Sequence, residues 1–317
     1  MDTSHRSGFV AILGRPNVGK STLLNALLGE KLAIVTPKPQ TTRDRILGIC
    51  PTPNGQLVFL DTPGVHRARK ALNQHLRDVA LATIPDADVI LFVLDASRAV
   101  NRLGRDEEAI IRAIIAQKKP AIAVLNKIDQ VQKLALLPLI KDLADRNCFQ
   151  AIIPVSARDR EGLEPLLAEA RNLVPEGPPL FAEDELTDRP MRFLVGELFR
   201  EQLMLSLADE LPYSIAVVVT RYKARSDRPL VEIDCTVHVE RTSQKGIVLG
   251  KGGERLKEVA TSARAAIEAL VGMQVYLRTH VRVEPGWTQS ERAMRKLGYT
   301  PTDTKTKKKR KKKRPKR

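Results

Sequence analysis

Cysteine is scarce in this chain: Cys50, Cys148 and Cys235 lie far apart within 317 residues. Three thiols at such spacings are too few for a disulfide framework or a zinc site, so we expect reduced side chains and a cytoplasmic protein. Long apolar runs are also missing, since none approaches the roughly 18 residues that span a bilayer. The first residues lack the basic-then-apolar order of a signal peptide.

Acidic residues are outnumbered: 37 Asp and Glu face 53 Lys and Arg, for a net charge of +16. Residues 305–317, KTKKKRKKKRPKR, hold 11 basic residues and no acid, which leaves +5 for the rest of the chain. Like charges repel and nothing here can pack, so we expect a disordered tail over residues 301–317. Its cations predict non-specific contact with nucleic-acid phosphates, with acidic membranes as the alternative.

The chain is long enough for two domains that each bury a core. Residues 1–173 alternate between apolar β-rich runs and amphipathic helical stretches, such as 107–117 and 134–147. This alternation predicts an α/β domain with a mostly parallel six-stranded sheet and helices on both faces. Asn54–Gly55 predicts one antiparallel hairpin. Strands are expected at 9–13, 45–50, 57–60, 89–95, 121–125 and 151–155.

Residues 174–190, VPEGPPLFAEDELTDRP, have no apolar period and predict a linker. The order of elements then changes. Helices are expected at about 191–210, 254–270 and 290–297, strands at 214–223, 230–240 and 274–283, and a short helical turn before residue 250. The order α-β-β-α-α-β over residues 191–300 predicts an α+β domain.

A phosphate-binding loop is predicted at residues 14–21, GRPNVGKS, which fit G-x-x-x-x-G-K-[ST] between a strand and a helix. Backbone N–H groups and the helix N-terminus surround the phosphates in such a loop. Lys20 can reach the β- and γ-phosphates and the Ser21 hydroxyl can ligate Mg²⁺. The nucleotide contacts expected here are Gly14, Asn17, Val18, Gly19, Lys20, Ser21 and Thr22.

Three more motifs follow predicted strands: DTPG at 61–64, NKID at 126–129 and VSA at 155–157. Asp61 would lie near the metal through water, and the Gly64 N–H would face the γ-phosphate. The Asp129 carboxylate can accept hydrogen bonds from guanine N1–H and N2, a pair of donors that adenine lacks. Ligands bind at this edge of open α/β sheets, so GTP or GDP is predicted. The contacts expected are Asp61, Thr62, Pro63, Gly64, Asn126, Lys127, Asp129, Ser156 and Ala157.

These four motifs resemble the translation-factor-like GTPases. The resemblance implies that PQTTRDR, residues 39–45, is the first switch, in which Thr41 or Thr42 closes onto Mg²⁺ and the γ-phosphate. Thr42 is favoured. The implied metal ligands are Ser21, Thr42 and Asp61, and the implied catalytic groups are Lys20, Thr42, Gly64 and Asn17.

Val65 stands where many GTPases place the glutamine that orients the attacking water. Hydrolysis is therefore slow, assisted by a partner, or driven by another device. Asn17 resembles the asparagine that helps related GTPases hold a monovalent cation, and K⁺ there could stabilise transition-state charge. A purely structural Asn17 is the alternative. His66 is expected to be solvated.

A second glycine loop, GIVLGKGGERLK at residues 246–257, fits neither a P-loop nor a dinucleotide loop. It contains G-x-x-G between two helices and after two strands, which resembles the loop of a type II KH domain, a clamp for about four single-stranded nucleotides. The RNA contacts expected are Gly250, Lys251, Gly252, Gly253, Arg255 and Lys257. Aromatic content of 4% argues against an RNA-recognition motif. Trp287 is expected either in the core or in base stacking.

A GTPase domain followed by a type II KH domain resembles the Era family of bacterial ribosome-assembly GTPases, from residue 8 to about residue 300. PQTTRDRILGI, ELPYSIAV and GWTQSERAMRKLGY carry the resemblance. It implies a monomer that binds 16S rRNA and the small ribosomal subunit, with peripheral contact to the cell membrane. The alternatives are a GTPase of tRNA modification, an RNA-binding module with a degenerate nucleotide site, and a membrane-associated regulatory GTPase.

Overall fold

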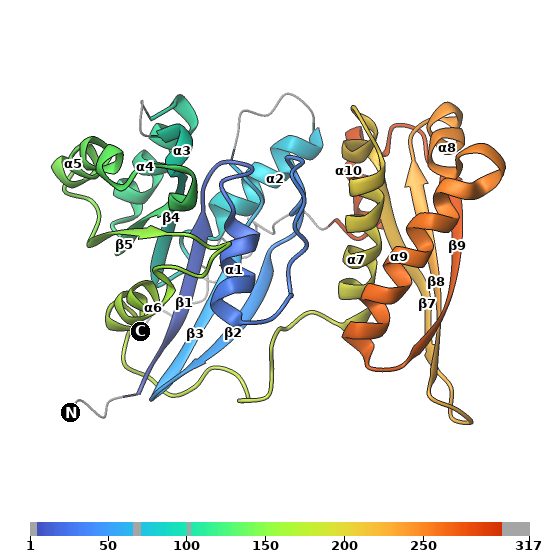
Figure 1. Ribbon diagram of the computed structural model, residues 1–317, viewed down its shortest axis with the longest axis horizontal. Helices are drawn as coiled ribbons and strands as arrows, with labels where there is room; N and C mark the ends of the chain where they lie inside the picture. Colours follow the sequence, from blue (N-terminus) through green and yellow to red (C-terminus); the bar gives the residue numbers. More distant parts are fainter. Residues whose placement is uncertain (1–4, 66–70, 100–102, 300–317) are drawn as a thin grey trace, which may run out of the picture.

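The computed structural model describes residues 5–65, 71–99 and 103–299. Figure 1 shows two bodies side by side, each built around its own sheet. The predicted tail, residues 301–317, and His66 lie outside the described residues. Among the residues described, no helix is long and apolar enough to cross a membrane.

The first body is a six-stranded sheet in the order β2-β3-β1-β4-β5-β6. All neighbouring strands are parallel except β2 and β3, which pair antiparallel across the Asn54–Gly55 turn, so the predicted α/β fold is confirmed. A Cβ on Gly55 would meet the Arg6 carbonyl oxygen at 1.8 Å, so this turn needs glycine. The strands are β1 (Arg6–Leu13), β2 (Ile46–Thr52), β3 (Gly55–Asp61), β4 (Val89–Asp95), β5 (Ala121–Asn126) and β6 (Ala151–Val155).

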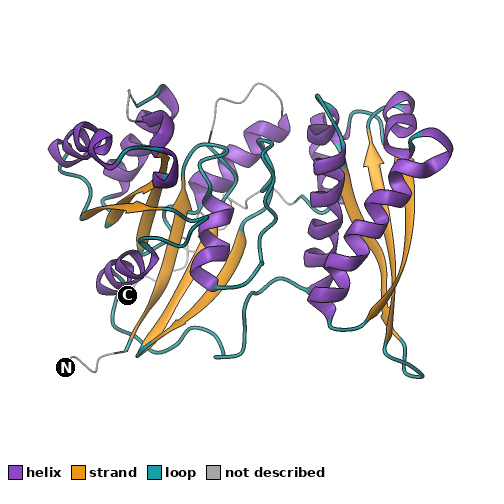
Figure 2. Ribbon diagram, viewed as in Figure 1, coloured by secondary structure: helices purple, strands orange, loops and turns teal. Residues whose placement is uncertain are grey.

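Helices cover both faces of this sheet (Figure 2). Apolar residues of α1 and α6 form one core with the sheet, and those of α2 to α5 form another. The expected helix over 134–147 was wrong at its start: a 3-10 turn comes first and α5 begins at Leu137, where Pro138 lacks the N–H that a helix interior needs. The helices are α1 (Lys20–Leu28), α2 (Ala71–Ala82), α3 (Ala96–Ala99), α4 (Arg105–Gln117), η1 (Ile128–Gln130), η2 (Lys133–Leu136), α5 (Leu137–Asp145) and α6 (Leu163–Leu173).

The predicted linker has no helix or strand and runs along the first body. The Ile49 N–H donates to the Leu186 carbonyl at 2.9 Å, and the Gln56 amide nitrogen donates to the Phe181 carbonyl at 2.9 Å. The Gln56 amide oxygen accepts the Phe181 N–H at 3.0 Å. These bonds fix the path of the segment toward the second body.

The second body has the predicted α-β-β-α-α-β order. Its sheet runs β7-β8-β9, with β8 antiparallel to β7 and parallel to β9. The first helix ends at Ser206, four residues earlier than expected, because Leu207 has an extended backbone and Asp209 a positive φ of 52°. The elements are α7 (Met191–Ser206), η3 (Leu211–Ser214), β7 (Ala216–Ala224), β8 (Leu230–Val239), α8 (Thr242–Leu249), η4 (Lys251–Gly253), α9 (Glu254–Val271), β9 (Gln274–Val283), η5 (Trp287–Gln289) and α10 (Glu291–Lys296).

Three helices of this body, α7, α8 and α9, pack on one face of its sheet around buried residues such as Phe199, Ile233 and Ile267. Alternate residues of β9, from Gln274 to Arg282, point to the opposite face and are exposed. The loop between α8 and α9 lies at one end of the domain, and the β7–β8 hairpin lies at the other (Figure 1).

Candidate functional site

The loop at residues 14–21 is shaped by glycines that leave no space for a side chain. A Cβ on Gly14 would lie 2.4 Å from the Val93 carbonyl oxygen. Gly19 has a φ of 93°, and a Cβ there would lie 2.3 Å from the Asn126 amide nitrogen. Helix α1 begins at the next residue, so its N-terminal N–H groups face the loop.

Two buried charges of opposite sign stand behind this loop. The Lys20 ammonium donates to the Arg15 carbonyl at 2.9 Å, and both Lys20 and Asp61 are buried. Burial lowers the pKa of Lys20 to about 8, although the charge of Asp61 opposes the shift. Burial also raises the pKa of Asp61, against the charge of Lys20 and hydrogen bonds from Ser21 and Thr42. Bound phosphate and a cation would compensate these charges.

Three oxygen-bearing side chains meet beside Lys20. The Ser21 hydroxyl donates to Asp61 Oδ2 at 2.6 Å and lies 2.8 Å from the Thr42 hydroxyl, which is 3.4 Å from the same carboxylate oxygen. The Thr41 hydroxyl turns away and donates to the Lys38 carbonyl at 2.7 Å. Asp61 Oδ1 is buried and has no hydrogen-bond partner among the described residues. Hard oxygen donors with one buried oxygen unmatched fit Mg²⁺.

The remaining loop residues surround the same hollow, which Asn17, Gly19, Thr22 and Gly64 line. The Asn17 amide donates to the Pro37 carbonyl at 3.0 Å and so ties the loop to the segment just before the first switch. Val65 is buried and its N–H donates to the Gly14 carbonyl at 3.1 Å. Its side chain cannot orient water.

Residues at the ends of β3 and β5 fix the walls of this edge. The Thr62 hydroxyl donates to the Ile12 carbonyl at 2.8 Å, and Pro63 lies between it and Gly64. The Asn126 amide donates to the Val18 carbonyl at 2.8 Å, which joins the phosphate loop to the NKID motif. The two motifs therefore form one surface.

The NKID and VSA motifs lie together at the other end of that surface. The Ser156 hydroxyl donates to Asp129 Oδ1 at 2.8 Å, and the exposed Arg158 pairs with Asp129 Oδ2 at 3.1 Å. Lys127 contacts the Asn17 carbonyl at 2.7 Å. The Ala157 N–H donates to Asn126 Oδ1 at 3.1 Å, so a contact with guanine O6 would need it to exchange that partner.

The second glycine loop, at residues 250–253, is open to solvent, unlike the enclosed loop at residues 14–21. Gly250, Gly252 and Gly253 all have positive φ, at 73°, 60° and 84°, which only glycine adopts readily. A Cβ on Gly252 or Gly253 would meet nothing within 4 Å, so the outer side of the loop is open. A polynucleotide backbone can approach this side closely.

The three basic side chains expected to bind RNA at this loop differ in their contacts within the protein. The Lys251 and Lys257 side chains are exposed. Arg255 donates to the Ile247 carbonyl at 2.8 Å, so it also joins α8 to α9. Trp287 is fully buried, and its indole N–H donates to the Ser214 carbonyl at 3.0 Å, so it belongs to the core and does not stack on bases.

Comparison with known proteins finds a GTPase domain in the first half of the chain and a KH domain in the second. A family model described as "50S ribosome-binding GTPase" matches residues 9–127, and one described as "KH domain" matches residues 210–288. GTPase Era of Geobacter metallireducens is 46% identical over 94% of this chain and 99% of its own length. GTPase Era of Xanthomonas oryzae is 46% identical over 93% of this chain and 97% of its own. This chain belongs to the Era family of GTPases.

Solved Era structures share the whole fold. Era of Aquifex aeolicus bound to GDP·AlF4⁻ is 40% identical, with a TM-score of 0.89 over 93% of this chain and 99% of its own. An Era complex with MgGDPNP and nucleotides 1506–1542 of 16S ribosomal RNA gives the same TM-score, identity and coverage. The predicted family, its GTPase activity and its two-part architecture are therefore confirmed.

One contact in this Era chain was not foreseen from the sequence: Arg43, next to Thr42, is buried in the KH half. Its guanidinium donates to the Ile215 and Pro212 carbonyls at 2.5 and 3.0 Å and to the Tyr299 hydroxyl at 3.1 Å. It also lies 6.0 Å from the ring centroid of Trp287. The first switch thus joins the nucleotide edge to the KH domain.

Two more bonds strengthen this junction. Arg200 of α7, itself buried, donates to the Thr41 carbonyl at 2.5 Å. Glu201, also on α7, accepts the Val35 N–H at 2.9 Å and pairs with Lys31 at 2.7 Å. No local pattern in the sequence predicts these contacts, because the partners lie far apart along the chain.

Proposed function

We propose that this chain is a GTP-driven switch that binds 16S rRNA through its KH domain and assists maturation of the small ribosomal subunit. The observation that carries the proposal is the pair of neighbours in the first switch. Thr42 contacts Ser21 at the nucleotide edge while Arg43 is buried against η3 and Tyr299 of the KH half. A change at the γ-phosphate would therefore act directly on the RNA-binding half.

The relative solved with MgGDPNP and a 16S rRNA fragment supports the ligand classes. By that likeness, this chain takes GTP or GDP with Mg²⁺ and a single-stranded stretch of 16S rRNA. The RNA contacts are assigned to Gly250, Lys251, Gly252, Gly253, Arg255 and Lys257, in an exposed loop suited to phosphates.

For the nucleotide, Lys20 would neutralise the β- and γ-phosphates, and the Gly64 N–H would hold the γ-phosphate. Ser21 and Thr42 would hold Mg²⁺, with Asp61 behind them, and the ion supplies charge neutralisation when bound. Asp129 and Ser156 would select guanine. The unmatched Asp61 Oδ1 and the shared position of the three oxygens support this assignment.

Since Val65 cannot orient water, Asn17 is assigned to a K⁺ ion beside the phosphates. Its amide contacts the Pro37 carbonyl, two residues before the first switch, and such carbonyls are suitable cation ligands. GTP turnover measured in potassium and in sodium tests this role. Faster turnover in potassium is expected, and equal rates would exclude it.

The working unit is taken to be a monomer in the cytoplasm, with a GTPase domain over 1–173, a linker over 174–190 and a KH domain over 191–300. Crosslinking in cells followed by sequencing of bound RNA tests the whole proposal. Reads concentrated in 16S rRNA are expected, whereas a footprint on tRNA would favour the tRNA-modification alternative. Sedimentation with anionic liposomes, with and without RNA, separates membrane contact from RNA contact.

A further inference from the structure

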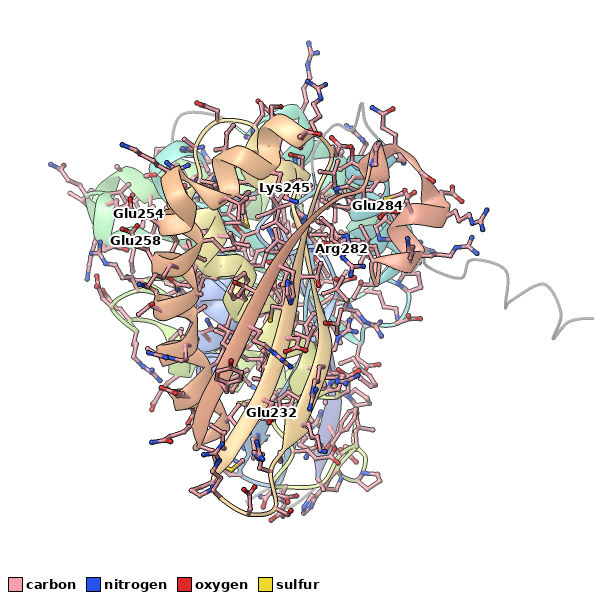
Figure 3. The ribbon with its side chains drawn as sticks, turned by 90° about the vertical axis from the view of Figure 1, so that its right-hand side faces the viewer. Glu232, Lys245, Glu254, Glu258, Arg282 and Glu284 are labelled. Atoms are coloured by element: carbon pink, nitrogen blue, oxygen red, sulfur yellow. The ribbon has the colours of Figure 1, made fainter. Side chains whose placement is uncertain are left out.

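A second concave surface lies in the KH half, at the end remote from the GxxG loop. This hollow of about 660 Å³ is bounded by the β7–β8 hairpin, the C-terminal half of α9 and the start of β9. Figure 3 shows that end of the sheet at the bottom, with Glu232 near it. The side chains that matter are Arg225, Arg228, Arg264, Tyr276, Glu232 and Glu268.

The two acids of the hollow are already engaged within the protein. Glu232 pairs with Arg221 at 2.7 Å and with Arg225 at 2.9 Å. Glu268 accepts the Val275 N–H at 2.9 Å. Glu232 therefore already balances two arginines, whereas Glu268 keeps its charge and forms no ion pair with Arg264 among the described residues.

Two arginines of the hollow have no such partner. Across the described ranges, neither the Arg228 nor the Arg264 guanidinium makes a hydrogen bond or ion pair, and both side chains are exposed. The nearby Asp227 pairs with Arg225 at 3.1 Å. Two unpaired guanidinium groups across a hollow suit phosphate oxygens, which they bind in a planar, bidentate manner.

An exposed aromatic ring lines the hollow from the far side of the edge strand β9, on the sheet face away from α9. Tyr276 is 55% exposed, and the Arg278 guanidinium, held by Asp234 at 2.7 Å, lies 5.8 Å from its ring centroid. Single-stranded nucleic acid is bound by such combinations of aromatic faces with cations, because every base has a face that stacks.

Helix α9 connects the hollow with the GxxG loop, because the helix begins directly after the loop and its C-terminal half lines the hollow. Lys257, Arg264 and Glu268 follow one another at helical spacing on one flank of α9, and the bond from Val275 to Glu268 turns this flank toward β9. Arg264 lies about 15 Å along the helix axis from Glu254, which follows the GxxG loop. In Figure 3, α9 runs beside β9 from Glu254 down toward the hairpin.

We propose that this hollow is a second RNA subsite, for a nucleotide of the same strand outside the roughly four that the GxxG loop clamps. Tyr276 stacks on its base, and Arg228 and Arg264 contact the flanking phosphates. The inference rests on the proposed RNA-binding function and extends the bound strand by residues of the β7–β8 hairpin.

Two single-stranded RNAs test the subsite in the full-length protein: one of about four nucleotides and one about twice as long. The longer strand is expected to bind the wild type more tightly. Tyr276→Ala should reduce this gain about tenfold and leave affinity for the short strand unchanged. Arg228→Gln with Arg264→Gln should also lower the slope of log affinity against log salt for the long strand by about 1.4.

A matched control removes two exposed arginines elsewhere: Arg105→Gln with Arg112→Gln on α4 should leave the gain intact. All substituted side chains are exposed, and unchanged melting temperatures would verify folding. If the variants keep the full gain from lengthening, the subsite does not exist. If the wild type binds neither strand, the proposed RNA-binding function fails, and the subsite fails with it.

Discussion

Two glycine loops in this molecule are assigned to phosphate, and they are built in opposite ways. The loop at 14–21 backs onto buried charges, with Lys20 and Asp61 both less than a tenth exposed. The loop at 250–253 presents open backbone and the exposed Lys251, and a Cβ added to Gly252 or Gly253 would meet nothing within 4 Å. The first arrangement suits a nucleotide of fixed size, which it would enclose, and the second suits an RNA strand that passes over an open surface.

This difference sets the size and the salt dependence of each contact. Buried charges act in a low dielectric, where losing one partner leaves the other uncompensated. Exposed cations are screened, and each contributes little alone. Substitutions in the first loop should therefore be severe and insensitive to salt, and those in the second should be mild and sensitive to salt.

Lys20→Ala should have the largest effect, because it removes the buried cation that faces the phosphates and Asp61. We expect GTP affinity to fall by about 2–5 kcal/mol, at least about thirtyfold in Kd, as measured by titration calorimetry. Lys251→Ala, which removes a cation from the other loop, serves as the control and should leave GTP affinity unchanged. Similar losses in both variants would remove the contrast between the loops.

Asp129→Asn should have the next largest effect, on base selectivity. The amide keeps one acceptor but replaces the charged oxygen that accepts the second guanine donor, so GTP affinity should fall about 10- to 150-fold. Xanthosine triphosphate, which has an oxygen in place of the N2 amino group, should gain affinity. Competition binding measures both. Arg158→Gln should keep guanine selectivity, because that arginine is mostly exposed.

The meeting of the four motifs at one edge of the sheet could be predicted from the sequence, because each motif is short and follows a strand end. Ser21, Thr42 and Asp61 were assigned together and lie together. The junction between the halves was not foreseen. Arg43 contacts Tyr299 across 256 positions, and a side chain buried by such distant partners leaves no periodicity to detect.

The same reason explains the other surprises. The linker composition indicated an irregular segment, but not its docking through Gln56 and Leu186. Trp287 was undecided, since one tryptophan suits a core or a stacking site equally well, and its packing among Leu72, Ala216, Met294 and Tyr299 buries it. Short motifs can be recognised in the sequence, whereas contacts between residues far apart along the chain cannot.

Arg43→Ala tests how the two loops communicate. Because Arg43 is buried in the KH half while Thr42 faces the metal site, its loss should uncouple them. We expect the ratio of RNA affinities with GTP analogue and GDP, typically 5- to 150-fold for coupled sites, to fall toward one. The reciprocal effect of RNA on GTP affinity should fall equally.

The control for this junction is Arg45→Gln, whose side chain is 41% exposed and whose one ion pair among the described residues is with Asp86 at 3.8 Å. It should keep the wild-type ratio. A ratio unchanged by Arg43→Ala would mean that nucleotide state reaches the RNA loop by another route, or that the protein is not a switch.

Lys251→Gln should have the smallest effect and isolates the second loop. The lysine side chain is exposed and makes no hydrogen bond or ion pair within the described part of the chain, so folding stability and GTP affinity should not change. Affinity for a short RNA strand should fall severalfold, and the slope of log affinity against log salt should decrease by about 0.7, one phosphate contact on a single strand. Filter binding at several salt concentrations measures both. A loss that is large and independent of salt would instead place Lys251 in an enclosed contact, and the two loops would then bind phosphate in the same way.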